Sequence, residues 1–159
     1  MKGGCIHHDL GILGAADHAA AERRRIRLMK ESGFDAIRAA HNPFGPAFLD
    51  ACDELGMLVV EEAFDEWVMG RTSFGLHVTF EQCWEKDLED MSARDYNHPC
   101  IVMWSTGNEV EERDGTADGF AWAKRLANKV RSLDASRPVS ATACALFSEY
   151  GNRPAGGTT

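Results

Sequence analysis

The order of local patterns along this chain restricts its fold more than any other feature. Short apolar runs typical of β-strands occur at residues 5–7, 35–39, 57–60, 100–104 and 139–143. Between them, apolar residues recur every three or four positions, as in helices, at residues 19–32, 46–55, 80–91 and 118–133. Strands and helices that alternate without hairpin turns require crossover connections, and therefore a parallel sheet. The two candidate architectures are an open doubly wound sheet and a (β/α)8 barrel.

The glycines after the first strand help to separate these two architectures. A doubly wound nucleotide-binding sheet carries a GxGxxG loop directly after its first strand. Here Gly11 and Gly14 lie in a loop without that spacing, so the nucleotide-binding version is disfavoured. With 159 residues, of which 44% are hydrophobic, the chain is long enough for one domain with a sizeable core.

Composition argues against several classes of partner. The formal net charge of −8 is unsuited to a phosphate backbone, and we interpret the only basic run, residues 23–27, as a solvated helix face. The chain shows no signal-peptide pattern, and no segment approaches the ~20 apolar residues of a membrane span. The five cysteines show no CxxC spacing, so neither a disulfide framework nor a zinc knuckle is indicated. We expect a soluble domain that binds neither nucleic acid nor membrane, in a compartment that the sequence leaves open.

Polar side chains gather where four of the predicted strands end. They are His7, His8 and Asp9 after the first strand, Arg38, His41 and Asn42 at the second, Glu61, Glu62, Asp65, Glu66 and Trp67 at the third, and Asn108 and Glu109 at the fourth. Active sites of barrels are built at the carboxyl ends of the strands. Each residue also has a structural alternative: the histidines can be satisfied core residues, Arg38 can pair with a neighbouring carboxylate, and Glu61 can be a solvated loop residue.

Glu109 is the strongest candidate for chemistry. It follows a buried strand and is preceded by Gly107 and Asn108 in the stretch WSTGNE. Desolvation in such a setting can raise the pKa of a carboxyl group towards that of a general acid. We therefore predict that Glu109 is a catalytic residue.

Five separated motifs resemble those of a known family. In chain order they read GGCIHHDLG, DAIRAAHNP, CDELGMLVVEEAFDEW, RDYNHPCIVMWSTGNE and SRPV, and they cover residues 2–143. They resemble the catalytic barrel of glycoside hydrolase family 2, which includes β-galactosidases, β-glucuronidases and β-mannosidases. The resemblance implies an α/β fold of (β/α)8 TIM-barrel type, incomplete, with the first four βα units and a fifth strand in residues 1–145. We expect residues 146–159, rich in Gly, Pro and Thr, to form a flexible tail.

The same resemblance implies a retaining mechanism on a β-linked sugar, with a β-galactoside as the first choice. Glu109 matches the acid/base, which protonates the glycosidic oxygen and then deprotonates the attacking water. Asn108 matches the residue that bonds the sugar 2-hydroxyl, and Arg38 matches an arginine near the nucleophile. Trp67 and Trp104 can each stack on a sugar or belong to the core, and we assign Trp67 to the substrate. The remaining implied substrate contacts are His7, Asp9, His41 and Asn42.

Two features depart from the pattern of that family. Metal-dependent β-galactosidases carry a glutamate and, two positions later, a histidine after strand three; Glu66 and Val68 occupy these positions, so we expect no metal or other cofactor. The family nucleophile is a glutamate at the end of strand seven, and the chain stops about sixteen residues after its fifth strand. Glu149, in SEYG, resembles the nucleophile motif, but only five residues separate it from the fifth strand, where a βα unit needs about 30. We interpret Glu149 as a tail residue.

Three functions are compatible with these residues. The first is a domain of a retaining β-glycosidase that holds the acid/base and lacks the nucleophile, and that has little or no activity alone. The second is a non-catalytic sugar-binding module, in which a second copy or the remainder of a barrel covers the open edges of the sheet. The third is a metal-dependent barrel hydrolase that uses His7, His8, His41 and a carboxylate.

Overall fold

The chain folds as one parallel sheet with its helices in the connections. The computed structural model describes residues 1–110, 112 and 118–142. Five strands lie side by side in these residues: β1 (Gly3–Ile6), β2 (Ala36–Ala39), β3 (Leu58–Glu62), β4 (Ile101–Asn108) and β5 (Val139–Thr142). The helices between consecutive strands are α1 (Ala19–Glu31), α2 (Pro46–Leu55), α3 (Phe80–Asp95) and α4 (Gly119–Leu133). Two 3-10 turns, η1 (Gly11–Leu13) and η2 (Leu76–Val78), precede α1 and α3.

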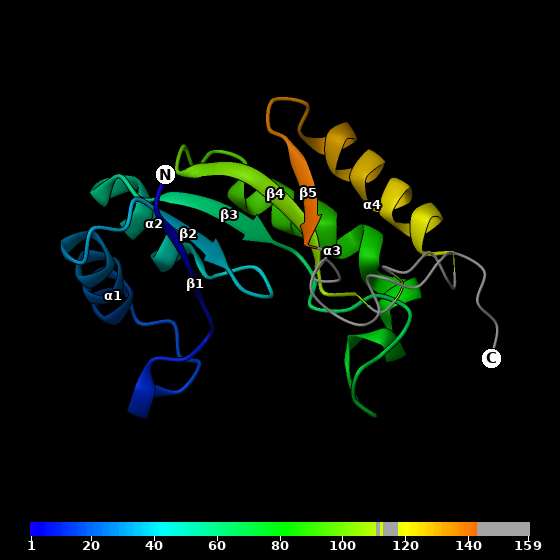
Figure 1. Ribbon diagram of the computed structural model, residues 1–159, viewed down its shortest axis with the longest axis horizontal. Helices are drawn as coiled ribbons and strands as arrows, with labels where there is room; N and C mark the ends of the chain where they lie inside the picture. Colours follow the sequence, from blue (N-terminus) through cyan, green and yellow to red (C-terminus); the bar gives the residue numbers. More distant parts are fainter. Residues whose placement is uncertain (111, 113–117, 143–159) are drawn as a thin grey trace.

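The strand order decides between the two candidate architectures. A doubly wound sheet reverses its strand order at a switch point. Here the order is β1-β2-β3-β4-β5, and every neighbouring pair is parallel. Right-handed crossovers that all advance in one direction place their helices on one face of the sheet. Figure 1 shows the sheet curving through the molecule, with α1 and α2 at one end and α4 at the other. The fold is therefore α/β and of TIM-barrel type, as a partial barrel.

Helix boundaries follow from proline and glycine. Pro46 opens α2, where its missing N–H is not needed, and Gly56 ends that helix with a left-handed φ of 66°.

Two strands run further than the sequence predicted. β3 continues past Val60 to Glu62, and β4 continues past Trp104 to Asn108. These extensions carry polar side chains into the sheet.

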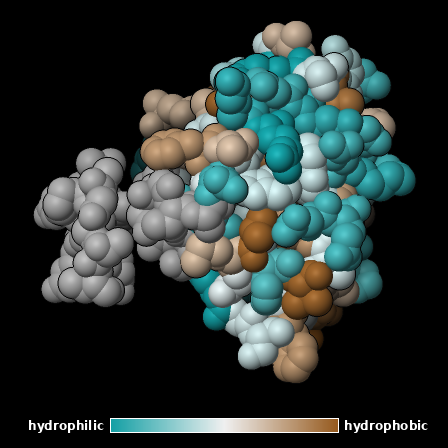
Figure 2. All heavy atoms as spheres, turned by 90° about the vertical axis from the view of Figure 1, so that its right-hand side faces the viewer, coloured by the Kyte–Doolittle hydropathy of each residue, from teal (hydrophilic) through white to brown (hydrophobic). Residues whose placement is uncertain are grey.

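The hydrophobic core lies between the sheet and the helices. Its fully buried members include Ile26, Ile37, Phe48, Leu49, Met57, Val59, Leu88 and Leu126. Figure 2 shows that the face towards α4 is mostly hydrophilic, with separate hydrophobic residues scattered over it. This is the surface of a helix layer that packs inwards on the sheet. Within the described residues, no helix has the length and apolarity that crossing a membrane requires.

Trp104 belongs to this core. Its side chain is 1% exposed, and the indole Nε1 donates to Asp134 Oδ2 at 2.8 Å. Arg137 Nη1 donates to the same oxygen at 2.7 Å. Burial alone would raise the pKa of Asp134, but the hydrogen bonds from Ser136, Trp104 and Arg137 together hold it well below its usual range. The core alternative for Trp104 is confirmed, because its ring offers no open face to a sugar.

Candidate active site

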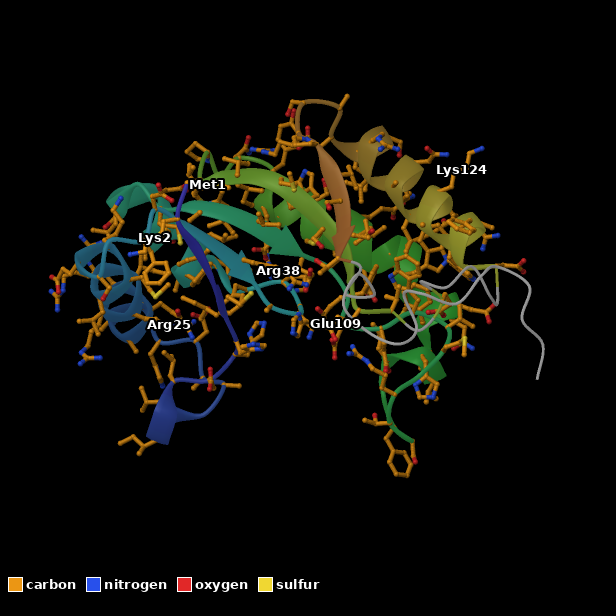
Figure 3. All side chains as sticks on the ribbon, viewed as in Figure 1. Met1, Lys2, Arg25, Arg38, Glu109 and Lys124 are labelled. Atoms are coloured by element: carbon orange, nitrogen blue, oxygen red, sulfur yellow. The ribbon has the colours of Figure 1, made fainter. Side chains whose placement is uncertain are left out.

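Three neighbouring strands present polar side chains on the face of the sheet opposite the described helices. Arg38 of β2 lies opposite Val60 of β3, and side chains two residues apart on a strand point to the same face. Arg38 and Glu62 therefore meet. Figure 3 shows Arg38 and Glu109 on the same side of the sheet, near the carboxyl ends of its strands.

Glu62 is the centre of a buried hydrogen-bond network. Its side chain is 0% exposed, and the Arg38 guanidinium donates to it from Nε at 3.0 Å and from Nη2 at 2.8 and 2.6 Å. Ser105 Oγ donates to Oε2 at 2.7 Å, and His41 Nδ1 lies 2.8 Å from Oε1. A buried charge needs such a set of partners, and the planar guanidinium matches a carboxylate with two parallel bonds. The alternative in which Arg38 pairs with a neighbouring carboxylate is confirmed.

Asn108 is held between a cation and an anion. Its Oδ1 accepts from Arg38 Nη2 at 2.9 Å, and its Nδ2 donates to Asp65 Oδ1 at 2.9 Å. The residue is 4% exposed. A flipped amide would face the guanidinium with its NH2 group and the carboxylate with its oxygen, so the two partners fix the orientation. Within the described part of the chain, one N–H of the amide is left for a further acceptor.

Glu109 is the first residue beyond β4 and is exposed. Its φ is 45°, in the left-handed region, and its backbone N–H donates to Thr142 O at 3.0 Å. The desolvated setting predicted from the sequence is therefore not observed in this structure. A strand pattern locates the end of β4, but it does not show what covers that end.

The other predicted sugar contacts lie on the loops after β1 and β2. The His7 and His41 rings meet edge to face, with centroids 4.9 Å apart, so His7 lies beside the Glu62 network. Asp9 and Asn42 are exposed. His8 stacks on Phe44 with centroids 4.0 Å apart, and its Nε2 is 3.0 Å from Asn42 O. His8 thus fits the alternative of a satisfied structural histidine.

Trp67 packs as a buried residue in this structure. It is 2% exposed, and its Nε1 donates to Thr106 O at 2.8 Å. The ring lies against Gly107, where an added Cβ would be 2.7 Å from Nε1. Neither face of the indole is open to a sugar, so the structure does not place Trp67 among the substrate contacts that the sequence predicted.

Glu61 contradicts the expectation of a solvated loop residue. It is a strand residue on the helix side of the sheet and is 0% exposed. Phe44 N donates to its Oε1 at 2.8 Å, and its Oε2 has no hydrogen-bond partner among the residues that the structure describes. Burial raises the pKa of Glu61 to about 8. Glu62 was not predicted as a site residue, although two successive carboxylates in a strand must point to opposite faces.

The pKa of Glu61 predicts an unusual dependence of stability on pH. The folded chain retains the Glu61 proton up to about pH 8, whereas the unfolded chain releases it near 4.5. Stability should therefore fall as pH rises between these values. We expect Glu61→Gln, which mimics the neutral acid, to remove this decline and to be more stable than the native chain at pH 8. Urea unfolding of the native chain and of Glu61→Gln at several pH values measures the decline and the difference in stability at pH 8. An equal decline in both proteins would contradict the prediction.

One group of potential metal ligands occurs in the described part of the chain, and it lies away from this site. The ligand atoms of Asp53, His98 and Cys100 are within 4.8 Å of one another. They lie at the amino end of β4 and bond to each other and to the backbone: Asp53 Oδ1 accepts from Cys100 N at 2.8 Å, and Oδ2 is 2.7 Å from His98 Nδ1. Burial raises the pKa of the Cys100 thiol, which disfavours the thiolate. His7, His8 and His41 are not members of this group.

The fold and the polar network define a class, namely a partial (β/α)8-barrel domain with a buried Arg–Glu–His–Asn site at the carboxyl ends of its strands. Sequence comparison gives the family. A model described as the TIM barrel domain of glycosyl hydrolases family 2 matches residues 1–150. The chain belongs to glycosyl hydrolase family 2.

Individual relatives agree with this assignment. A β-galactosidase from Bacteroides ovatus is 37% identical over 89% of this chain, and a putative β-glucuronidase from Formosa agariphila is 36% identical over 79%. A crystal structure of a family 2 member from Bacteroides cellulosilyticus superimposes with a TM-score of 0.86, at 48% identity over 89% of this chain. This chain spans only 20%, 12% and 18% of these three proteins, respectively.

Two predictions lie outside the described residues. They are the flexible tail at residues 146–159 and the assignment of Glu149 to that tail. Roles in binding or catalysis stay predictions for Glu109, Asn108, Arg38, His7, Asp9, His41 and Asn42.

Proposed function

We propose that this chain provides the acid/base half of the active site of a retaining β-glycosidase, with a β-galactoside as the first candidate substrate. The observation that carries the proposal is the fixed amide of Asn108 directly before Glu109. A positioned donor beside a carboxyl group is what a sugar 2-hydroxyl next to the reacting carbon requires. In this proposal Glu109 protonates the leaving oxygen and later deprotonates water.

Arg38 supports the proposal through its charge and position. The Arg38 cation lies in the site and binds Glu62, so it stabilises negative charge in its surroundings. A retaining mechanism also needs a second carboxylate about 5 Å from the first. We assign that nucleophile to a segment beyond the strands described here. The chain alone should therefore show little or no hydrolysis.

A chimera tests this function. Residues 1–142 would replace the matching segment of the Bacteroides ovatus β-galactosidase, and aryl β-galactosides, β-glucuronides and β-mannosides would be assayed. Turnover of at least one glycoside is the expected result, and its identity names the substrate class. A folded chimera that cleaves none of them contradicts the proposal. If the chimera does not fold, NMR titration of the chain with methyl β-glycosides decides, because unchanged Asn108 and Glu109 signals would exclude sugar binding at this site.

A self-associating, non-catalytic module is the second candidate. Among the described strands, β1 and β5 each have one neighbour, so each leaves an open edge. Leu58, on the face opposite the described helices, is 37% exposed. Open edges and exposed apolar side chains favour association. Light scattering distinguishes the candidates: a stable dimer would support the module, and a cooperatively folded monomer would argue against it.

A further inference from the structure

The loop between β3 and η2 is built around the side chain of Glu66. This residue is 5% exposed. Its Oε2 accepts from the backbone N–H of Arg71 at 2.9 Å, and its Oε1 accepts from the backbone N–H of His77 at 3.1 Å. The His77 ring adds a contact from Nδ1 to Oε1, also at 3.1 Å. One buried carboxylate therefore ties together two backbone positions that are six residues apart.

Two glycines make room for this arrangement. A Cβ on Gly75 would overlap the Glu66 carboxylate, and a Cβ on Gly70 would overlap the His77 imidazole. The carboxylate and the ring thus pack directly against backbone, where no other residue would fit. We call Glu66, Gly70, Gly75, His77 and the Arg71 N–H the Glu66 clasp.

The Glu66 clasp does not fit a metal ion. In the metal-dependent pattern described above, a histidine lies two positions after the glutamate, and here Val68 has no ligand atom. Both oxygens of Glu66 are already acceptors for protein donors. A divalent cation would compete with these N–H donors for the carboxylate lone pairs, and position 68 supplies no second ligand to hold it.

Arg71 connects the Glu66 clasp to the candidate active site. Arg71 Nη2 donates to the backbone oxygen of Asp65 at 2.5 Å and also bonds Asp65 Oδ1. That carboxylate oxygen is the acceptor for the Asn108 amide. Arg71 Nη2 is also 3.5 Å from Asn108 O. Asp65 is therefore shared between the loop and the site.

We propose that Glu66 is a positioning residue that replaces a metal ion as the organiser of this loop. By fixing the backbone at Arg71 and His77, it directs the Arg71 guanidinium onto Asp65. Asp65 in turn keeps the Asn108 amide in its observed orientation. The inference rests on the proposed function only for the role of Asn108 in sugar binding, and the experiment below does not depend on turnover.

NMR of the chain labelled with nitrogen-15 tests the clasp. We expect Glu66→Gln to shift the side-chain NH2 signals of Asn108 and to speed hydrogen exchange at the Arg71 and His77 amides by about tenfold or more, because one acceptor becomes a donor. Glu81→Gln, at an exposed position in the first turn of α3, is the matched control and should change neither. Arg71→Met removes the contact between Arg71 and Asp65 without altering the buried Glu66 carboxylate. It should therefore shift the Asn108 signals, and it can be measured even if Glu66→Gln does not fold.

The response of the melting temperature to magnesium distinguishes the Glu66 clasp from a metal site. We expect millimolar MgCl2 or EDTA to leave the melting temperature of the native chain unchanged. Val68→His, which restores the metal-dependent pattern, should gain no magnesium response. A melting temperature that rises with magnesium and loses this response in Glu66→Gln would overturn the proposal. So would unchanged Asn108 signals in Arg71→Met.

Discussion

Glu109→Gln in the active chimera is expected to lower kcat/KM for glycosides with poor leaving groups by about 10²–10⁴-fold, the range that general acid–base catalysis contributes. Glutamine keeps the size of the side chain but can neither donate the proton nor accept it from water. Aryl glycosides with very good leaving groups need little protonation, so their glycosylation step should be affected less. Added azide should restore part of their turnover, since an anion attacks without a general base.

The control for Glu109→Gln is Glu85→Gln, an exposed position on α3. It removes the same charge at a distance from the site and should leave the kinetics unchanged. If Glu109→Gln instead kept kcat/KM within about twofold for poor leaving groups, Glu109 would not be the general acid. The wider proposal would then need another proton donor at the carboxyl ends of the strands.

Arg38→Met is expected to destabilise the folded chain by about 3–5 kcal/mol, as is usual when one partner of a buried ion pair is removed. The reason is the burial of Glu62: its side chain is 0% exposed, and it would lose three hydrogen bonds from the guanidinium. Arg38→Lys keeps the charge but not the planar fork, so its loss should be intermediate. Urea unfolding at neutral pH measures all three proteins.

A surface arginine provides the comparison for Arg38→Met. Arg27 on α1 is 62% exposed and faces Glu31 at 3.8 Å. Exposed pairs of this kind contribute about 0–1 kcal/mol. Arg27→Met should therefore change the unfolding free energy little. A similarly small change in Arg38→Met would show that the network around Glu62 does not stabilise the sheet.

Much of the fold could be predicted because its signals are local. The apolar spacing of residues 19–32 and 46–55 marks α1 and α2, and Pro46 and Gly56 mark the ends of the second helix. Alternation predicted a parallel sheet, since parallel neighbours require crossovers, but the consecutive strand order was established by the structure. The ends of β3 and β4 were less predictable. Glu61 and Asn108 look like loop residues in sequence, but they pair with neighbouring strands, and their side chains bond the distant residues Phe44 and Arg38.

The position of the site was predicted, but the hydrogen bonds between its residues were not. Four strand ends were identified, and Arg38, His41 and Asn108 do meet there. Glu62 was missed as their common partner because a single sequence does not reveal which of two adjacent carboxylates faces which side. The exposure of Glu109 and the burial of Trp67 depend on neighbours in space. A strand pattern contains no information on them.

The consecutive order of the strands has a consequence for how this chain acquires its structure. Each new strand pairs with the one that precedes it in sequence, so its partner already exists when it leaves the ribosome. Among the five described strands, none has to wait for a distant segment, and each step closes one loop that contains one helix. Co-translational folding could therefore proceed from β1 towards β5, with β5 as the growing edge.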